Sequence, residues 1–64
     1  MLTARQTDVL GLLARGVTVK RTAALLGIGE STVKHHARDC RRALGARNNA
    51  QAVGIALTKG LIVP

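Results

Sequence analysis

Basic and hydroxyl side chains recur along residues 30–44 at intervals that gather them on one side of an α-helix. At about 100° per residue, one arc of this helix carries Ser31, Lys34, His35, Arg38, Arg41 and Arg42. Such cations and hydrogen-bond donors can bind phosphate oxygens and the edges of bases. A helix about 10–12 Å across also fits the DNA major groove. The arc therefore predicts contact with duplex DNA, although a merely solvated basic face would show the same pattern.

The opposite side of the same segment is apolar. Val33, Ala37, Cys40 and Leu44 follow one another at helical spacing, which predicts that this side packs against a core. Cys40 is the only cysteine of the chain. Because it lies on the apolar stripe, we expect its thiol to be buried, protonated and unreactive.

Metal binding and catalysis have little support in these residues. His35 and His36 are adjacent, so on a helix they diverge by about 100° and cannot hold one ion together. His36 and Cys40 are four residues apart and could bind the same ion. A structural zinc site needs four ligands, however, and these two residues supply only two. Paired carboxylates and a phosphate-binding P-loop are also missing from the sequence. We therefore expect no metal, no cofactor and no enzymatic activity.

The composition favours a polyanionic partner. The 64 residues contain ten Lys and Arg against three Asp and Glu, a formal charge of +7. Phe, Tyr and Trp, on which single-strand binders stack bases, are all absent, so duplex DNA is the better candidate. The sequence has neither a long apolar span nor a signal-peptide pattern. We expect no membrane association and a cytoplasmic, nucleoid-associated protein, with a composition typical of a GC-rich bacterial or phage genome.

Glycines divide the chain into short helical segments. The first begins after Thr3, which with Gln6 three residues later forms a capping-box pattern, and it ends near Gly16. The second begins after Thr18 and ends at Gly27, a residue suited to the left-handed position after a helix.

Two further helices follow. The basic segment starts at residue 29 or 30 and ends at Gly45, and the fourth helix begins with a second capping-box pair, Asn48 and Gln51, and ends at Gly60. The four segments predict a single all-α, compact four-helix domain over residues 1–64. Two of them, joined by Gly27-Ile28-Gly29, form a helix-turn-helix pattern.

The fourth helix is apolar over much of its circumference, whereas a surface helix needs only one apolar stripe. A domain this small also gains stability from a partner chain. We therefore expect this helix to form a homodimer interface, with alanines that simply tolerate exposure as the alternative. The candidate interface residues are Ala52, Val53, Ile55, Ala56 and Lys59.

Several runs of residues resemble one known family, the LuxR/GerE-type DNA-binding domain, in order and spacing. The most specific is Ser31-Thr32-Val33-Lys34 with His36 two residues beyond the lysine. The other matching runs are Leu2-Thr3-Ala4-Arg5-Gln6, Val9-Leu10, Ala14-Arg15-Gly16, Leu26-Gly27-Ile28, Leu44-Gly45, Ala50-Gln51-Ala52-Val53 and Lys59-Gly60-Leu61-Ile62. The resemblance covers nearly the whole chain.

The resemblance implies a four-helix fold whose third helix binds in the major groove and whose fourth helix forms the dimer. It implies base contacts from Lys34, His35 and Arg38. The residues expected near phosphates are Thr18, Lys20, Ser31, Thr32, His36, Arg41, Arg42 and Arg47. For some of these a structural role is the alternative: Thr32 as a helix cap, Lys20 as a solvated charge and His36 as a satisfied histidine beside the apolar stripe.

The chain departs from the usual family pattern at four positions. Gln6 replaces a Glu, and Gly29 replaces a Ser or Thr cap, a loss usually worth only a few tenths of a kcal/mol. Ala43 and Asn49 stand where the family often has a basic residue and an Arg. These changes remove polar groups expected on the DNA side, for which Arg41, Arg42 and Arg47 are the candidates to compensate.

Two functions are compatible with this pattern. The favoured one is a sequence-specific double-stranded DNA-binding transcriptional regulator, a homodimer that binds an inverted repeat through its third helix. The alternative is a small basic adaptor that binds RNA polymerase or another regulator, with weak or no DNA binding. Because Leu2-Thr3 already belongs to the motif and the chain begins with Met1, we expect a complete single-domain regulator rather than an excised domain.

Overall fold

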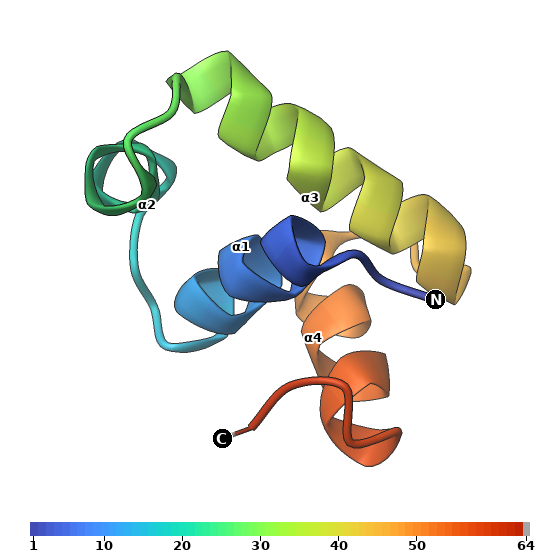
Figure 1. Ribbon diagram of the computed structural model, residues 1–64. Helices are drawn as coiled ribbons and strands as arrows, with labels where there is room; N and C mark the ends of the chain where they lie inside the picture. Colours follow the sequence, from blue (N-terminus) through green and yellow to red (C-terminus); the bar gives the residue numbers. More distant parts are fainter. Residues whose placement is uncertain (64) are drawn as a thin grey trace.

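The computed structural model describes residues 1–63, and within them the chain forms four helices (Figure 1). They are α1 (Ala4–Ala14), α2 (Val19–Leu26), α3 (Glu30–Leu44) and α4 (Asn49–Thr58). The expected all-α, four-helix architecture and its helix boundaries are confirmed. The last residue of the predicted 1–64 domain lies outside the described residues.

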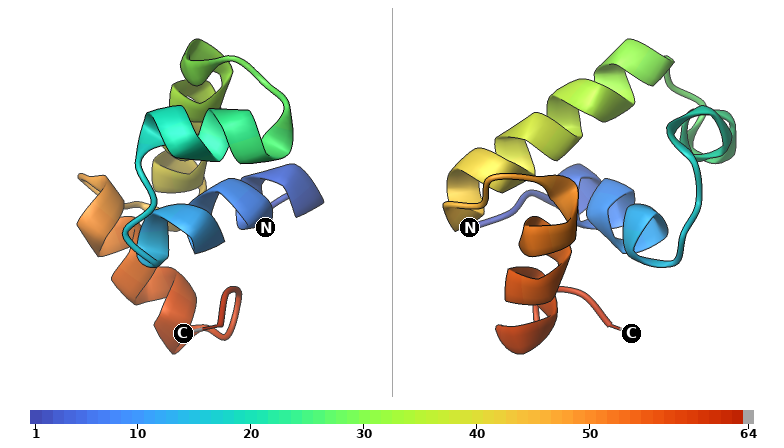
Figure 2. Two further views of the ribbon diagram at one scale, coloured as in Figure 1. Left: turned by 90° about the vertical axis from the view of Figure 1, so that its left-hand side faces the viewer. Right: turned by 180° about the vertical axis from the view of Figure 1, so that it is seen from behind.

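The helices that carry the predicted helix-turn-helix lie on one side of the molecule. α3 is the longest helix and crosses over α1, with α2 beside one end of this pair and α4 beside the other (Figures 1 and 2). Both α1 and α3 contact each of the other helices, whereas α2 and α4 make no contact with each other in residues 1–63. The pair α1 and α3 therefore forms the centre of the domain.

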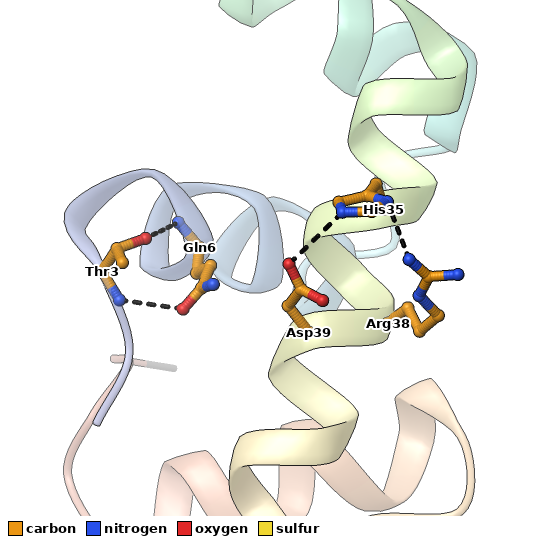
Figure 3. A network of polar contacts seen from close by, with 5 residues as sticks. All are labelled: Thr3, Gln6, His35, Arg38 and Asp39. Carbon is orange, nitrogen blue, oxygen red and sulfur yellow. Dashed lines mark hydrogen bonds and ion pairs between the residues drawn. The ribbon is translucent and has the colours of Figure 1, made fainter.

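Side-chain caps start three of the four helices. Thr3 Oγ1 accepts a hydrogen bond from the backbone N–H of Gln6 at 3.1 Å, and Gln6 Oε1 accepts one from the N–H of Thr3 at 2.9 Å (Figure 3). Thr18 Oγ1 caps α2 by accepting from the N–H of Arg21 at 3.0 Å. These contacts satisfy helix N–H groups that would otherwise lack partners, and they confirm the predicted starts of α1 and α2.

The cap of α4 differs in part from the prediction. Asn48 Oδ1 accepts from the N–H of Gln51 at 2.8 Å as expected, but Gln51 Oε1 accepts from the N–H of Arg47 at 2.6 Å rather than from Asn48. The φ angle is −151° at Asn48 and −74° at Thr3, a rotation that turns the N-cap N–H relative to its helix. The second capping box is therefore not formed. The Gln51 side chain instead binds the backbone N–H of Arg47, one residue before the N-cap.

A sharp turn connects α2 to α3. Gly27 ends α2 with φ 68°, in the left-handed region that a side chain disfavours. The N–H of Ile28 then donates to the carbonyl of Ala23 at 3.0 Å. Gly29 precedes α3 without a side-chain cap, as its lack of a side chain dictates. This turn sets the angle between the two helices of the motif.

The core consists of two clusters that share α1 and α3 and lie at successive positions along α3. Val9, Ala23, Val33 and Ala37 pack between α1, α2 and α3. The second cluster joins α1, α3, α4 and the C-terminal segment, and contains Leu10, Cys40, Ala52, Ala56 and Ile62. The predicted apolar stripe of α3 thus faces the core, with Val33, Ala37 and Cys40 buried and Leu44 half-buried. None of the helices in the described part of the chain is long and apolar enough to cross a membrane.

Candidate nucleic-acid interface

The side of α3 that faces away from α1 and α4 is not covered by any element within residues 1–63 (Figures 1 and 2). This orientation follows from the buried stripe on the other side, which fixes how the helix is rotated. The exposed positions on α3 include Ser31, Thr32, Lys34, His35, Arg38 and Arg42, while His36 and Arg41 are half-buried. The basic arc predicted from the sequence is therefore available to a ligand.

Five of these side chains line an open hollow of about 280 Å³ on α3. They are Ser31, Lys34, His35, Arg38 and Arg41. The hollow brings together the three residues expected to contact bases and two of those expected near phosphates. A surface with several cations, a hydroxyl and an imidazole can bind an anion and donate hydrogen bonds to base edges at the same place.

His35 lies between two charged neighbours on the same helix. Arg38 donates from Nη2 to His35 Nδ1 at 2.9 Å, and His35 Nε2 lies 3.7 Å from Asp39 Oδ2 (Figure 3). A guanidinium has only N–H donors, so Nδ1 of the imidazole must be the acceptor. The ring hydrogen of neutral His35 is therefore on Nε2, on the side of the Asp39 carboxylate.

Arg41 has a second role that the sequence did not reveal. Its Nη1 donates to Oδ1 of Asn49 at 2.6 Å, which links α3 to the first residue of α4. In the sequence, Asn49 was notable only because the family often has an arginine at this position. The structure shows it as the acceptor that holds the Arg41 side chain, and no local sequence signal distinguishes these two roles.

The remaining residues expected near phosphates are distributed over other elements. Thr18 and Lys20 are exposed at the start of α2, and Arg47 is exposed in the segment between α3 and α4. None of these three lines the hollow on α3. The oxygen of Thr18 is used as the α2 cap, which leaves its hydroxyl hydrogen able to donate.

Cys40 is fully buried on the core side of α3 and its Sγ contacts the backbone carbonyl of Gln6 at 3.6 Å. Burial raises the pKa of the thiol, the nearby Asp39 carboxylate raises it further, and Arg41 acts in the opposite direction. The thiol therefore stays protonated near neutral pH. No group of three or more His, Cys, Asp or Glu side chains in residues 1–63 is placed to hold a metal ion.

The structure corrects part of the expected dimer interface on α4. Ala52 and Ala56 are fully buried in the core of the single chain, so they have no surface to offer a second copy. These two positions lie one turn apart on the side of α4 that packs against α1 and α3. Of the other three candidates, Val53 and Ile55 are half-buried and Lys59 is exposed. Leu57, which the sequence analysis did not select, is a large apolar side chain that is 38% exposed.

Comparison with known proteins gives matches over most of the chain. The family described as "Bacterial regulatory proteins, luxR family" matches residues 1–56. The quorum sensing-dependent transcriptional regulator RpaR of Rhodopseudomonas palustris is 43% identical over 61 residues, which are 95% of this chain and 25% of RpaR. The nitrate/nitrite response regulator NarP of Escherichia coli is 44% identical over 52 residues, which are 81% of this chain and 24% of NarP. The chain thus spans about a quarter of the length of these curated relatives.

Solved structures show the same fold. The structure of the transcription factor GerE aligns with a TM-score of 0.93 at 31% identity, over 97% of this chain and 92% of that one. VqmA of Vibrio cholerae, in a complex with a ligand and DNA, aligns with a TM-score of 0.86 at 35% identity, over 94% of this chain and 26% of that one. These relatives are described as regulators or transcription factors, the class of protein that the sequence predicted. By sequence, fold and helix-turn-helix geometry, the chain belongs to the LuxR family of bacterial regulatory proteins.

Proposed function

We propose that this protein is a sequence-specific transcriptional regulator that binds double-stranded DNA with α3 in the major groove. The observation that carries the proposal is the uncovered face of α3, where Lys34, His35 and Arg38 line one hollow. An α-helix fits the major groove, where each base pair presents a distinct pattern of donors and acceptors. Such binding would place the protein on the bacterial nucleoid.

Within this proposal the side chains divide into two groups. Lys34 and Arg38, one turn apart and both exposed, donate to base edges, and His35 contacts Arg38. The second group fixes the position of the domain on the DNA backbone. Its members are Thr18, Lys20, Ser31, Thr32, His36, Arg41, Arg42 and Arg47, of which His36 and Arg41 are half-buried and the rest exposed.

We also propose that two copies pair through α4 to bind an inverted repeat. The α4 residues with surface left for a second copy lie on the two flanks of the buried Ala52 and Ala56 stripe. They are Val53 and Leu57 on one flank, and Ile55 and Lys59 on the other. A symmetric dimer of helix-turn-helix domains binds half-sites about 34–36 Å apart, one turn of DNA. Pairing on DNA adds the binding energies of the two half-sites even where the free protein is monomeric.

A protein partner such as RNA polymerase is a second candidate, favoured by one feature. The lining of an open groove of about 400 Å³ includes the apolar side chains of Leu12, Leu26 and Ile62 and the charged side chains of Asp8 and Arg15. It shares no residue with the hollow on α3. A protein partner in this groove would therefore not depend on the residues of the α3 hollow.

The test is selection of bound sites from a random duplex pool, followed by salt titration of binding to the selected duplex and to a random one. We expect specific binding at least about 10³-fold tighter than random binding, together with a steep salt dependence. Arg15→Ala, which removes a cation from the groove and not from the hollow, should leave binding unchanged. Equal affinity for selected and random duplexes would contradict sequence-specific regulation, and absence of salt-dependent binding would favour the adaptor.

A further inference from the structure

We propose that His35 is a positioning residue for Arg38 and acts on base recognition through the Arg38 guanidinium. The proposal rests on the proposed function, because it concerns how α3 binds DNA. It replaces one assignment implied by the family resemblance, in which His35 belongs to the set that contacts bases. The imidazole instead fixes the direction of the Arg38 guanidinium, and Arg38 makes the base contact.

Both ring nitrogens of His35 are already directed at protein groups. Nδ1 accepts from Arg38 Nη2 at 2.9 Å, and Nε2 lies 3.7 Å from the Asp39 carboxylate (Figure 3). Nδ1 is therefore occupied while the Arg38 contact holds, whereas Nε2 faces the carboxylate at a distance too long for a hydrogen bond. A base contact through Nδ1 would need the ring to leave Arg38.

Arg38, in contrast, keeps most of its donors after this contact. A guanidinium has five N–H donors, and the bond to Nδ1 uses one of them. The remaining donors can still form the paired contact to O6 and N7 of guanine. One contact thus restricts the side chain without removing its capacity to bind a base.

Restricting Arg38 has a direct effect on binding. A free arginine side chain has large rotamer entropy, and ordering it at an interface weakens association. The side chain of Arg38 is exposed on α3 and, among residues 1–63, makes its side-chain hydrogen bond to His35. Asp39 is half-buried and lies on the other side of the ring. The hydrogen bond to His35 therefore limits the directions that the exposed Arg38 guanidinium can take.

Two polar substitutions separate the roles of the two ring nitrogens. In His35→Asn the amide oxygen can occupy the place of Nδ1 and accept from Arg38, whereas in His35→Gln the amide lies near the place of Nε2. Binding of each variant is measured on the selected duplex and on the set of its single base-pair changes. The base pair read by Arg38 is identified from Arg38→Ala on the same set.

We expect His35→Ala and His35→Gln to lose about fivefold selectivity at the Arg38 base pair and to leave the other positions unchanged. His35→Asn should retain the selectivity. In an Arg38→Ala background, His35→Ala should have no further effect, because the residue acts through Arg38. A loss at a different base pair, or one that persists without Arg38, would overturn the proposal and show that His35 contacts a base itself.

A second measurement uses the free protein. The ¹⁵N chemical shifts of the His35 ring should show an unprotonated Nδ1 and a protonated Nε2, and Arg38→Ala should shift the Nδ1 resonance. A protonated Nδ1, or an Nδ1 resonance that does not shift in Arg38→Ala, would overturn the positioning role even if DNA binding is selective. The expected shifts without selective DNA binding would instead mean that the proposed function has failed, and the DNA role of His35 with it.

Discussion

Arg41 and Asn49 join α3 to α4 through a hydrogen bond of 2.6 Å between the guanidinium Nη1 and the amide Oδ1. Both side chains are half-buried, so the contact is partly protected from competing water. It is the place where the helix proposed to bind DNA is tied to the helix proposed to form the dimer. The arginine is thus both a structural donor and one of the cations of the α3 hollow.

Asn49→Ala should lower the free energy of unfolding by about 1–2 kcal/mol, because it leaves a charged donor without its acceptor. Asn49→Asp is the matched control, since it keeps an acceptor and adds a charge favourable at a helix N-terminus. Both variants are compared by urea unfolding. The same measurement on Arg41→Ala, alone and combined with Asn49→Ala, gives the coupling free energy between the two residues. Strictly additive losses would show that the contact does not stabilise the fold.

Thr22 offers a stabilising substitution. Its side chain is fully buried and its Oγ1 has no hydrogen-bond partner within residues 1–63. Burying an unsatisfied hydroxyl costs about 1–3 kcal/mol. Thr22→Val, which keeps the shape, should therefore raise the free energy of unfolding by about 1 kcal/mol. The control is Thr58→Val at an exposed helical position, where the hydroxyl already donates to the carbonyl of Gly54 at 2.9 Å. This change should not stabilise the fold, and an equal gain for the two variants would reflect helix propensity instead.

The buried thiol gives the stability a defined pH dependence. Burial raises the pKa of Cys40 above its ordinary value of 9.0, so the unfolded chain loses this proton at a lower pH than the folded protein. The contribution to stability is complete below pH 9.0 and is lost as the pH rises through the folded-state pKa. The stability advantage of the native chain over Cys40→Ala should therefore shrink above pH 9.0. A constant difference in denaturant titrations would contradict this.

Self-association through α4 predicts a contrast between two leucines. Leu57 on α4 and Leu25 on α2 are 38% and 52% exposed, so glutamate at either position should leave the domain folded. Leu57→Glu should remove the gain from a second half-site, about a hundredfold or more in affinity, whereas Leu25→Glu should not remove it. Sedimentation with one-site and two-site duplexes makes the comparison. Retention of the full two-site gain in Leu57→Glu would exclude this face from the dimer.

Lys20 and Arg38 should differ in how their loss depends on the DNA sequence. Lys20→Ala should weaken binding to all duplexes alike and reduce the salt slope by about one, as expected for a phosphate contact. Arg38→Ala should cost about 1–3 kcal/mol at one base pair and relax the preference there. Fluorescence anisotropy across salt concentrations and duplex variants measures both. An unchanged slope in Lys20→Ala would remove that residue from the interface.

Local rules predicted the helices well because each signal acts within a few residues. Thr3 and Thr18 accept hydrogen bonds from the N–H groups three residues later, and Gly27 takes the left-handed conformation that ends α2. The stripe of Val33, Ala37 and Cys40 likewise needs only the helical period to predict its burial. The rotation of α3, and hence its basic face, follows from that stripe.

Contacts between helices could not be predicted in the same way. α4 is apolar over so much of its surface that the helical period does not predict which side faces the core. Ala52 and Ala56 were therefore expected at the dimer surface, whereas the structure buries both of them in the core. The partner of Arg41 is eight residues away and depends on how α4 packs. The contact between Arg38 and His35 was also missed, because the rotamers of these two exposed side chains decide whether they meet.

Val9 and Leu10 are adjacent in α1, yet one belongs to the cluster with α2 and the other to the cluster with α4. Since α2 and α4 make no contact in the described part of the chain, a substitution on the outer surface of either helix has no direct neighbour on the other to disturb. The outer surfaces of α2 and α4 can therefore change independently of each other, with α1 and α3 as the shared frame between them.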